Sequence, residues 1–159
     1  MMHNWFTCKI RYTKTMENGM NKRVTEPYLV DALSFTEAES RIIEEITPYM
    51  TGEFVVSGVA RANYSELFFS DEESADKWYK CKLYFITLDE KTGATKRTAT
   101  NILVQASGLK DAIKKLDEGM KGTLADYESA SVSETAIMDV YPYEADTDVK
   151  PEFKDAPNR

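Results

Sequence analysis

Alternating apolar and polar residues open the chain. From Phe6 to Tyr12 every second residue is apolar, which is the spacing of a β-strand with one buried face. The inward positions are Phe6, Cys8, Ile10 and Tyr12, and the outward positions are Trp5, Thr7, Lys9 and Arg11. Gly19 can adopt the positive φ that a tight reversal needs. The pattern therefore predicts an antiparallel partner strand at about residues 22–33.

A helix with one apolar face is expected next. The apolar residues at helical spacing are Phe35, Ala38, Ile42, Ile46 and Tyr49. Thr36 and Glu39 have the spacing of a capping box, in which each side chain satisfies a free backbone N–H. This predicts a helix over residues 36–47. The extended segment 53–69 then predicts a strand, a bend and another strand.

The same order of elements is written twice. WFTCKIRY at residues 5–12 is matched by WYKCKLYF at residues 78–85, and the similarity continues at an offset of 73 or 74. The second copy predicts strands at 78–85 and 95–106, a helix at 110–121 and extended segments over 126–143. Its helical stripe consists of Leu109, Ala112, Ile113, Leu116 and Met120, and its turn residues are Gly93 and Gly122.

These elements predict an α+β fold built by tandem duplication of a β-β-α-β(β) unit, with antiparallel sheets, one helix per repeat and pseudo-twofold symmetry. The first repeat spans residues 1–70, an acidic seam 71–77, the second repeat 78–143 and a flexible tail 144–159. One copy alone leaves a sheet edge and much apolar surface exposed, so we expect the repeats to share a core.

Composition narrows the chemistry. The chain has 159 residues, two cysteines and one histidine, His3. Cys8 and Cys81 share the inward register, so we expect buried free thiols rather than a disulfide. No stretch resembles a membrane span or a signal peptide, which predicts a cytoplasmic protein. With one terminal histidine and no phosphate-binding loop motif, we expect no catalysis, no cofactor and no metal site.

Charge is unevenly distributed along the chain. Residues 1–30 carry five basic and two acidic side chains, and residues 76–105 carry six and three, although the formal net charge is −7. Both predicted hairpins are therefore basic. The candidate binding residues are Trp5, Lys9, Arg11, Lys22, Arg23, Trp78, Lys80, Lys82, Tyr84, Lys96 and Arg97.

Two interpretations of these residues stay open. A basic sheet face with aromatic rings is typical of proteins that bind single-stranded nucleic acid. Alternatively, Trp5 and Trp78 lie at strand starts and pack under the helix or against the other repeat, and the lysines lie on a solvated sheet face.

Several long phrases carry a resemblance to a known family. VTEPYLVDALSFTEAESRIIEE, VARANYSELFF, WYKCKLYFITLDE and GMKGTLADYE, together with the opening strand, are similar to a domain-of-unknown-function family of small proteins from Bacteroides-type bacteria and their phages. The resemblance covers residues 4–143. It implies a cytoplasmic protein linked to phages or mobile elements, and it implies no activity and no catalytic residues.

We therefore expect a non-catalytic binding or adaptor protein that engages a protein partner through sheet edges or the groove between the repeats. The alternative is a nucleic-acid-binding accessory protein that uses the two basic hairpins. We expect that the protein does not bind a membrane. The sequence does not predict an oligomeric state.

Overall fold

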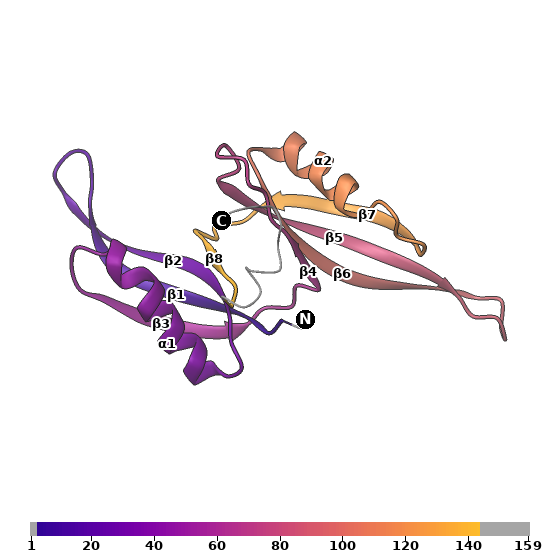
Figure 1. The fold of residues 1–159 in the computed structure, drawn as a ribbon, viewed down its shortest axis with the longest axis horizontal. Helices are drawn as coiled ribbons and strands as arrows, with labels where there is room; N and C mark the ends of the chain where they lie inside the picture. Colours follow the sequence, from indigo (N-terminus) through magenta and orange to yellow (C-terminus); the bar gives the residue numbers. More distant parts are fainter. Residues whose placement is uncertain (1–2, 144–159) are drawn as a thin grey trace. The chain divides into compact units, whose positions relative to one another are not determined.

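A computed structural model describes residues 3–143, and the predicted tail at 144–159 lies outside the described residues. The chain forms two compact units (Figure 1). Of the described residues, the first unit combines 3–62 with 136–143, and the second unit is Asn63–Thr135. Each unit contains one four-stranded sheet and one helix, which confirms the predicted α+β duplication.

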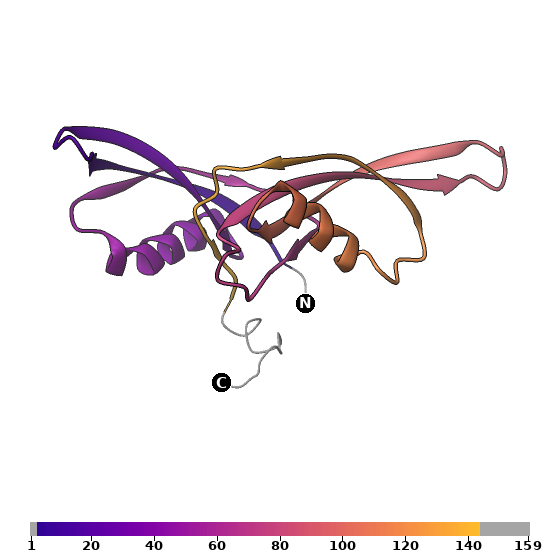
Figure 2. The same cartoon turned by 90° about the horizontal axis from the view of Figure 1, so that it is seen from above.

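The first unit has the sheet order β3-β1-β2-β8, and α1 lies against one face of this sheet (Figure 1). Its elements are β1 (Trp5–Thr15), β2 (Asn21–Asp31), α1 (Phe35–Ile46), the 3-10 turn η1 (Thr47–Tyr49), β3 (Phe54–Arg61) and β8 (Val140–Tyr141). The strands β1, β2 and β3 are antiparallel, and β8 adds to β2 in parallel. The hairpin of β1 and β2 extends past the end of α1 (Figure 2).

The second unit has the equivalent order β7-β5-β6-β4. Its elements are β4 (Glu66–Phe68), β5 (Lys77–Leu88), β6 (Thr95–Ala106), α2 (Leu109–Gly119) and β7 (Asp126–Glu134). Here β4 adds in parallel to β6. The turn glycines occupy the left-handed region as predicted, with φ of 84° at Gly19, 75° at Gly93 and 88° at Gly122.

The fourth strands are exchanged between the repeats. β4 follows the third strand of the first repeat but pairs with β6, and β8 follows the third strand of the second repeat but pairs with β2. The pairs Leu29–Val140 and Leu67–Leu103 occupy equivalent positions of the duplication. The compact units therefore differ from the repeats predicted at 1–70 and 78–143, because each sheet takes its fourth strand from the other repeat.

The start of α1 corrects the predicted capping box. The N-cap is Ser34, whose Oγ accepts a hydrogen bond of 3.1 Å from the Glu37 N–H. Glu37 Oε1 in turn accepts a bond of 2.7 Å from the Leu33 N–H. The sequence contains two overlapping S/T-x-x-E patterns, and the one at Ser34 is used instead of Thr36 and Glu39. α1 consequently begins one residue earlier than predicted.

Each helix buries a stripe on its own sheet. Ala38, Ile42 and Ile46 pack in one cluster with the inward residues of β1, and Leu116 and Met120 pack in the cluster of the second unit. Phe35 and Tyr49 were predicted on the first stripe, but their exposed fractions are 49% and 79%. Phe35 lies at the first residue of α1, and Tyr49 lies in η1 beyond its last turn. The shared core of the two repeats stays a prediction.

A cation on each helix secures the exchanged strand. In the first unit, the Arg41 guanidinium donates to the carbonyl oxygens of Asp31, Tyr141 and Pro142 and lies 4.9 Å from the ring centre of Tyr143. These contacts hold the segment that contains β8 against α1 and the end of β2.

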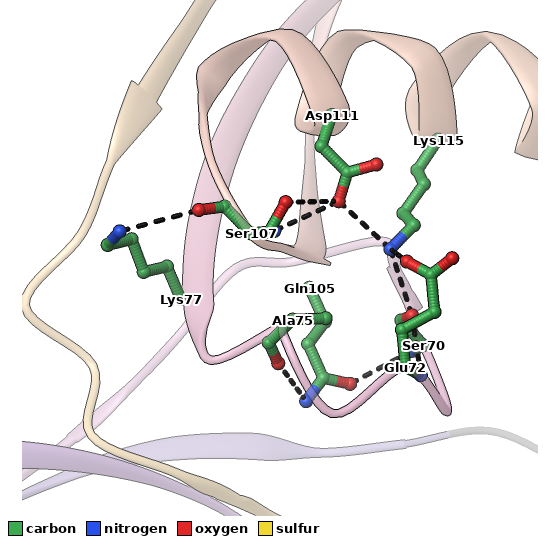
Figure 3. Close-up of polar contacts among 8 residues, drawn as sticks. All are labelled: Ser70, Glu72, Ala75, Lys77, Gln105, Ser107, Asp111 and Lys115. Carbon is green, nitrogen blue, oxygen red and sulfur yellow. Dashed lines mark hydrogen bonds and ion pairs between the residues drawn. The ribbon is translucent and has the colours of Figure 1, made fainter.

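Lys115 takes the corresponding position on α2 (Figure 3). Its Nζ lies 2.9 Å from Ser70 Oγ, 2.6 Å from Glu72 Oε1 and 3.0 Å from Asp111 Oδ2. Ser70 and Glu72 directly follow β4, so Lys115 secures the strand that comes from the first repeat. The two cations are 74 residues apart, which is the offset of the duplication at the helices.

Cys8 and Cys81 are free and buried, as predicted. The Cys8 thiol lies 3.8 Å from the carbonyl oxygen of Ala38, to which it donates. Burial raises the pKa of each thiol to about 11, and the nearby Glu39 carboxylate adds to the shift at Cys8. Neither thiol is therefore a ready nucleophile near neutral pH.

We expect alkaline pH to weaken the fold through these thiols. The unfolded chain releases its thiol protons near pH 9 and the folded chain near pH 11, so the free energy of unfolding falls between these values. The slope is about 1.4 kcal/mol per pH unit for each thiol. Urea unfolding at pH 8, 9, 10 and 11 measures it. Cys81→Ala should reduce the slope by that amount, and an unchanged slope would contradict the assignment.

Neither helix in the part of the chain that the structure describes is long and apolar enough to cross a bilayer.

Candidate functional site

The two predicted tryptophans lie inside the protein. The exposed fractions of Trp5 and Trp78 are 4% and 3%. The Trp5 ring stacks on His3 with ring centres 5.0 Å apart, and the Trp78 ring meets Phe69 edge to face at 5.5 Å. These rings offer no exposed face for stacking on a base, so the packing alternative holds for both.

The predicted basic residues of the first unit divide between two sheet faces. Lys9 and Arg11 lie on the face of β1 away from α1, and Arg23 shares this face because it pairs with Thr13. Lys22 lies on the opposite face. Lys9, Arg11 and Arg23 are all exposed, and they form the outer basic face of the first unit.

The second unit divides in the same way. Lys80, Lys82 and Tyr84 lie on the outer face together with Arg97, whereas Lys96 lies on the helix side. Arg97 forms an ion pair with Glu128, and its guanidinium lies 4.3 Å from the ring centre of Tyr84. Lys82 Nζ lies 5.3 Å from the same ring. Tyr84 is thus occupied by the unit's own cations.

A groove of about 610 Å³ lies in the first unit, on the helix side of its hairpin. Its floor is formed by β1 and β2, which contribute Tyr12, Glu26 and Tyr28. One wall is formed by η1 and the turn after it, and another by residues 138–141 around β8. We call it the tyrosine groove, because four tyrosines line it: Tyr12, Tyr28, Tyr49 and Tyr141.

Hydrogen bonds and ring contacts fix the floor of the groove. The Tyr12 hydroxyl donates to Glu26 Oε1 at 2.9 Å. The rings of Tyr28 and Tyr141 stack with an interplanar angle of 19° and centres 6.2 Å apart. This ring pair joins β2 to the exchanged strand β8, so the groove depends on a residue that comes from the far end of the described chain.

The groove combines neutral hydroxyls with excess negative charge. Partial burial, followed by the hydrogen bond to Glu26, raises the pKa of Tyr12 to about 12. Burial is also the main cause that raises the pKa of Tyr28 and of Tyr141, so these hydroxyls keep their protons near neutral pH. Of the described residues that line the groove, three are acidic, Glu26, Glu53 and Asp139, and Lys14 alone is basic.

Equivalent positions of the second repeat carry apolar residues. Tyr12 corresponds to Phe85, Tyr28 to Ile102 and Tyr141 to Phe68. All three apolar residues join the core cluster of the second unit. Phe68 also closes on the end of α2, where a Cβ atom added to Gly119 would stand 2.5 Å from its ring. Tyr12, Tyr28 and Tyr141 likewise pack against the core cluster of the first unit. The two units therefore differ in the hydroxyl groups that these positions carry, and not in whether the side chains are packed.

Sequence patterns directed attention to the basic hairpins and missed this groove. Its residues come from four segments of the chain, 12–15, 26–28, 46–53 and 138–141, and β8 reaches it only through strand exchange. A signal was nevertheless present. In the alignment of the two repeats, residues with hydroxyls and a carboxylate in one copy correspond to apolar or neutral residues in the other. Such a difference within a duplicated chain indicates that the two surfaces have diverged.

Comparison with known proteins gives a family without an assigned role. A family model described as a domain of unknown function (DUF4494) matches residues 4–143. No curated protein and no solved structure shows a significant match to the chain.

Proposed function

Since the chain belongs to this family of unknown function, its role must come from its own residues, and we propose that it is a non-catalytic binding protein that engages a protein partner. The observation that supports the proposal is the tyrosine groove of the first unit, where Tyr12, Tyr28 and Tyr141 carry hydroxyls and the equivalent residues of the second unit are apolar. Tyrosine is enriched in protein interfaces, since it offers a large ring and a hydroxyl at low cost in conformational entropy.

The shape of the groove suits part of a protein chain. Its volume lies in the range of sites that take small molecules or a few side chains, about 300–1,000 Å³. Tyr49 forms an exposed rim, with an exposed fraction of 79%. An exposed aromatic rim beside a hollow is where a partner's side chains gain contact area without any rearrangement of the core.

Loss of the groove rim should abolish partner capture. The tagged full chain is compared with a Tyr49→Ala/Glu53→Gln variant in lysates of the cells that carry the gene. Both positions are exposed, so the variant should fold normally while losing at least tenfold in captured partner. Quantitative mass spectrometry of the captured proteins measures the effect.

A matched control places the same two changes on the second unit. Tyr84→Ala/Glu128→Gln removes an aromatic ring and a carboxylate from the outer face there, and it should retain the partner. The proposal fails if the groove variant and the wild-type chain capture the same proteins in equal amounts.

A second candidate function is nucleic-acid binding, favoured by the outer basic face of the first unit. Lys9, Arg11 and Arg23 are exposed on one sheet face, where phosphates could meet them. A single-stranded oligonucleotide should then shift at low salt, and Lys9→Gln/Arg11→Gln should reduce the shift. Absence of a shift at low salt removes this candidate, because phosphate binding strengthens as salt is lowered.

A further inference from the structure

The edge of β2 beside the tyrosine groove is open. β8 pairs with β2 only at Leu29 and Val30, and Pro27 accepts a further bond from the Met138 N–H. Among residues 3–143, the strand pairs leave this edge uncovered from Asn21 to Glu26. Glu26 also lines the groove, so open edge and groove meet at this residue.

The direction of the backbone groups on this edge follows from the bonds to β8. The Leu29 N–H donates to the Asp139 carbonyl at 3.0 Å, and thus points away from β1. Along a strand paired on one side in antiparallel fashion, every second residue directs its N–H and C=O to the same edge. Thr25 and Arg23 therefore present these groups to the open edge, where an added strand could pair with them.

The charges in the groove indicate which side chains an added strand would carry. Glu26, Glu53 and Asp139 outnumber the one cation of the groove lining, Lys14, and still outnumber the cations when Lys22, on the same face of β2, is counted. The tyrosine rings present faces that attract cations. Asp139 is exposed, and its Oδ1 accepts a hydrogen bond of 2.8 Å from the Val140 N–H. A cationic side chain placed there would gain charge-assisted hydrogen bonds and ring contacts together.

We infer that the tyrosine groove binds an extended, basic segment of a partner protein, which adds as a strand to the edge of β2 at residues 21–26 and directs lysine or arginine side chains toward Glu26, Glu53 and Asp139. This inference rests on the proposed function and names the chemistry of the partner. Since side chains of a strand alternate between two faces, every second residue of the segment enters the groove. The partner sequence should therefore alternate basic and other residues.

The probe is a capped peptide of about eight residues that alternates lysine with valine, titrated into the full chain by calorimetry. Matched peptides carry glutamine or glutamate in place of lysine. We expect the lysine peptide to bind at least tenfold more tightly than the glutamine peptide, and the glutamate peptide to show no binding. Glu26→Gln/Asp139→Asn should weaken binding of the lysine peptide at least tenfold. Glu66→Gln, at the position equivalent to Asp139, should leave this binding unchanged.

Proline variants test the strand edge separately. Thr25→Pro removes an outward N–H from β2 without removing a bond to β1, and proline is tolerated on edge strands. It should reduce binding of the lysine peptide at least tenfold. Ala99→Pro makes the equivalent change on β6 and should have no effect. Circular dichroism of both variants confirms that they fold.

Several outcomes would overturn the inference. Equal binding of the lysine and glutamine peptides would contradict the claim that the partner segment is basic. Peptide binding that is unchanged in Thr25→Pro would contradict the claim that the segment adds as a strand. Spermine binding as tightly as the peptide, and unaffected by Thr25→Pro, would assign the groove to a free polyamine. If no peptide binds while partner capture still depends on Tyr49 and Glu53, the inference fails and the proposed function stands.

Discussion

Arg41→Ala is expected to lower the free energy of unfolding by about 3 to 4 kcal/mol, because several hydrogen bonds to a charged group are lost together. The Arg41 side chain is only 16% exposed, and its guanidinium contacts three carbonyl oxygens and the Tyr143 ring. Without it, the carbonyls of Tyr141 and Pro142 lose their donor and β8 loosens from β2. Urea unfolding at neutral pH measures the loss.

Hydrogen exchange locates the effect of this substitution. The Leu29 amide, which donates across the edge to Asp139, should exchange faster in Arg41→Ala. Lys114→Ala is the control, since Lys114 is an exposed cation on the other helix. A loss below about 0.5 kcal/mol with unchanged Leu29 exchange would show that Arg41 does not hold β8, since surface substitutions away from such contacts have effects of that size.

Residues 1–74 expressed alone should not form a stable monomer. This fragment lacks β8, so Leu29 and Val30 lose their pairing partners, and it carries β4 without β6. It should be unfolded at low concentration, or dimerise when β4 of each copy takes the place of β8 in the other. Light scattering and circular dichroism at several concentrations distinguish these states.

Mixing the two halves provides the complementary test. Residues 75–159 contain β8 but lack β4, so each half supplies the strand that the other needs. An equimolar mixture should recover the spectrum of the intact chain as a one-to-one complex. A monomeric 1–74 fragment that melts cooperatively at a temperature independent of concentration would contradict both the need for exchange and the predicted shared core.

The repeat and its elements could be predicted because they depend on local patterns. Alternation from Phe6 to Tyr12, the glycines at the hairpin turns and the stripes of Ala38, Ile42 and Ile46 each report a period within a single element. Even the one misplaced cap, at Thr36 instead of Ser34, moved the helix by a single residue.

Strand exchange could not be predicted in this way. Leu67 and Val140 match each other in the aligned repeats whether each pairs with its own sheet or with the other one, so their similarity carries no information on partners. The same limit hid the tyrosine groove, whose wall at Tyr141 exists only because β8 crosses to β2. Of the basic candidate residues, Lys82 is half-buried and the others are exposed, and the register separates Lys22 and Lys96 from the others onto the opposite face.

Exchange also explains how two copies of one unit could become different. A protein with a single repeat would take its fourth strand from a second molecule, so its folding would depend on concentration, and both molecules would carry identical surfaces. Fusion of two copies in one chain makes the exchange intramolecular, at an effective concentration on the order of millimolar. Each fourth strand then has a single destination. Tyr141 could become a groove residue in one sheet while Phe68 filled the core of the other. The two chains of a symmetric dimer could not differ in this way, because they have the same residue at this position.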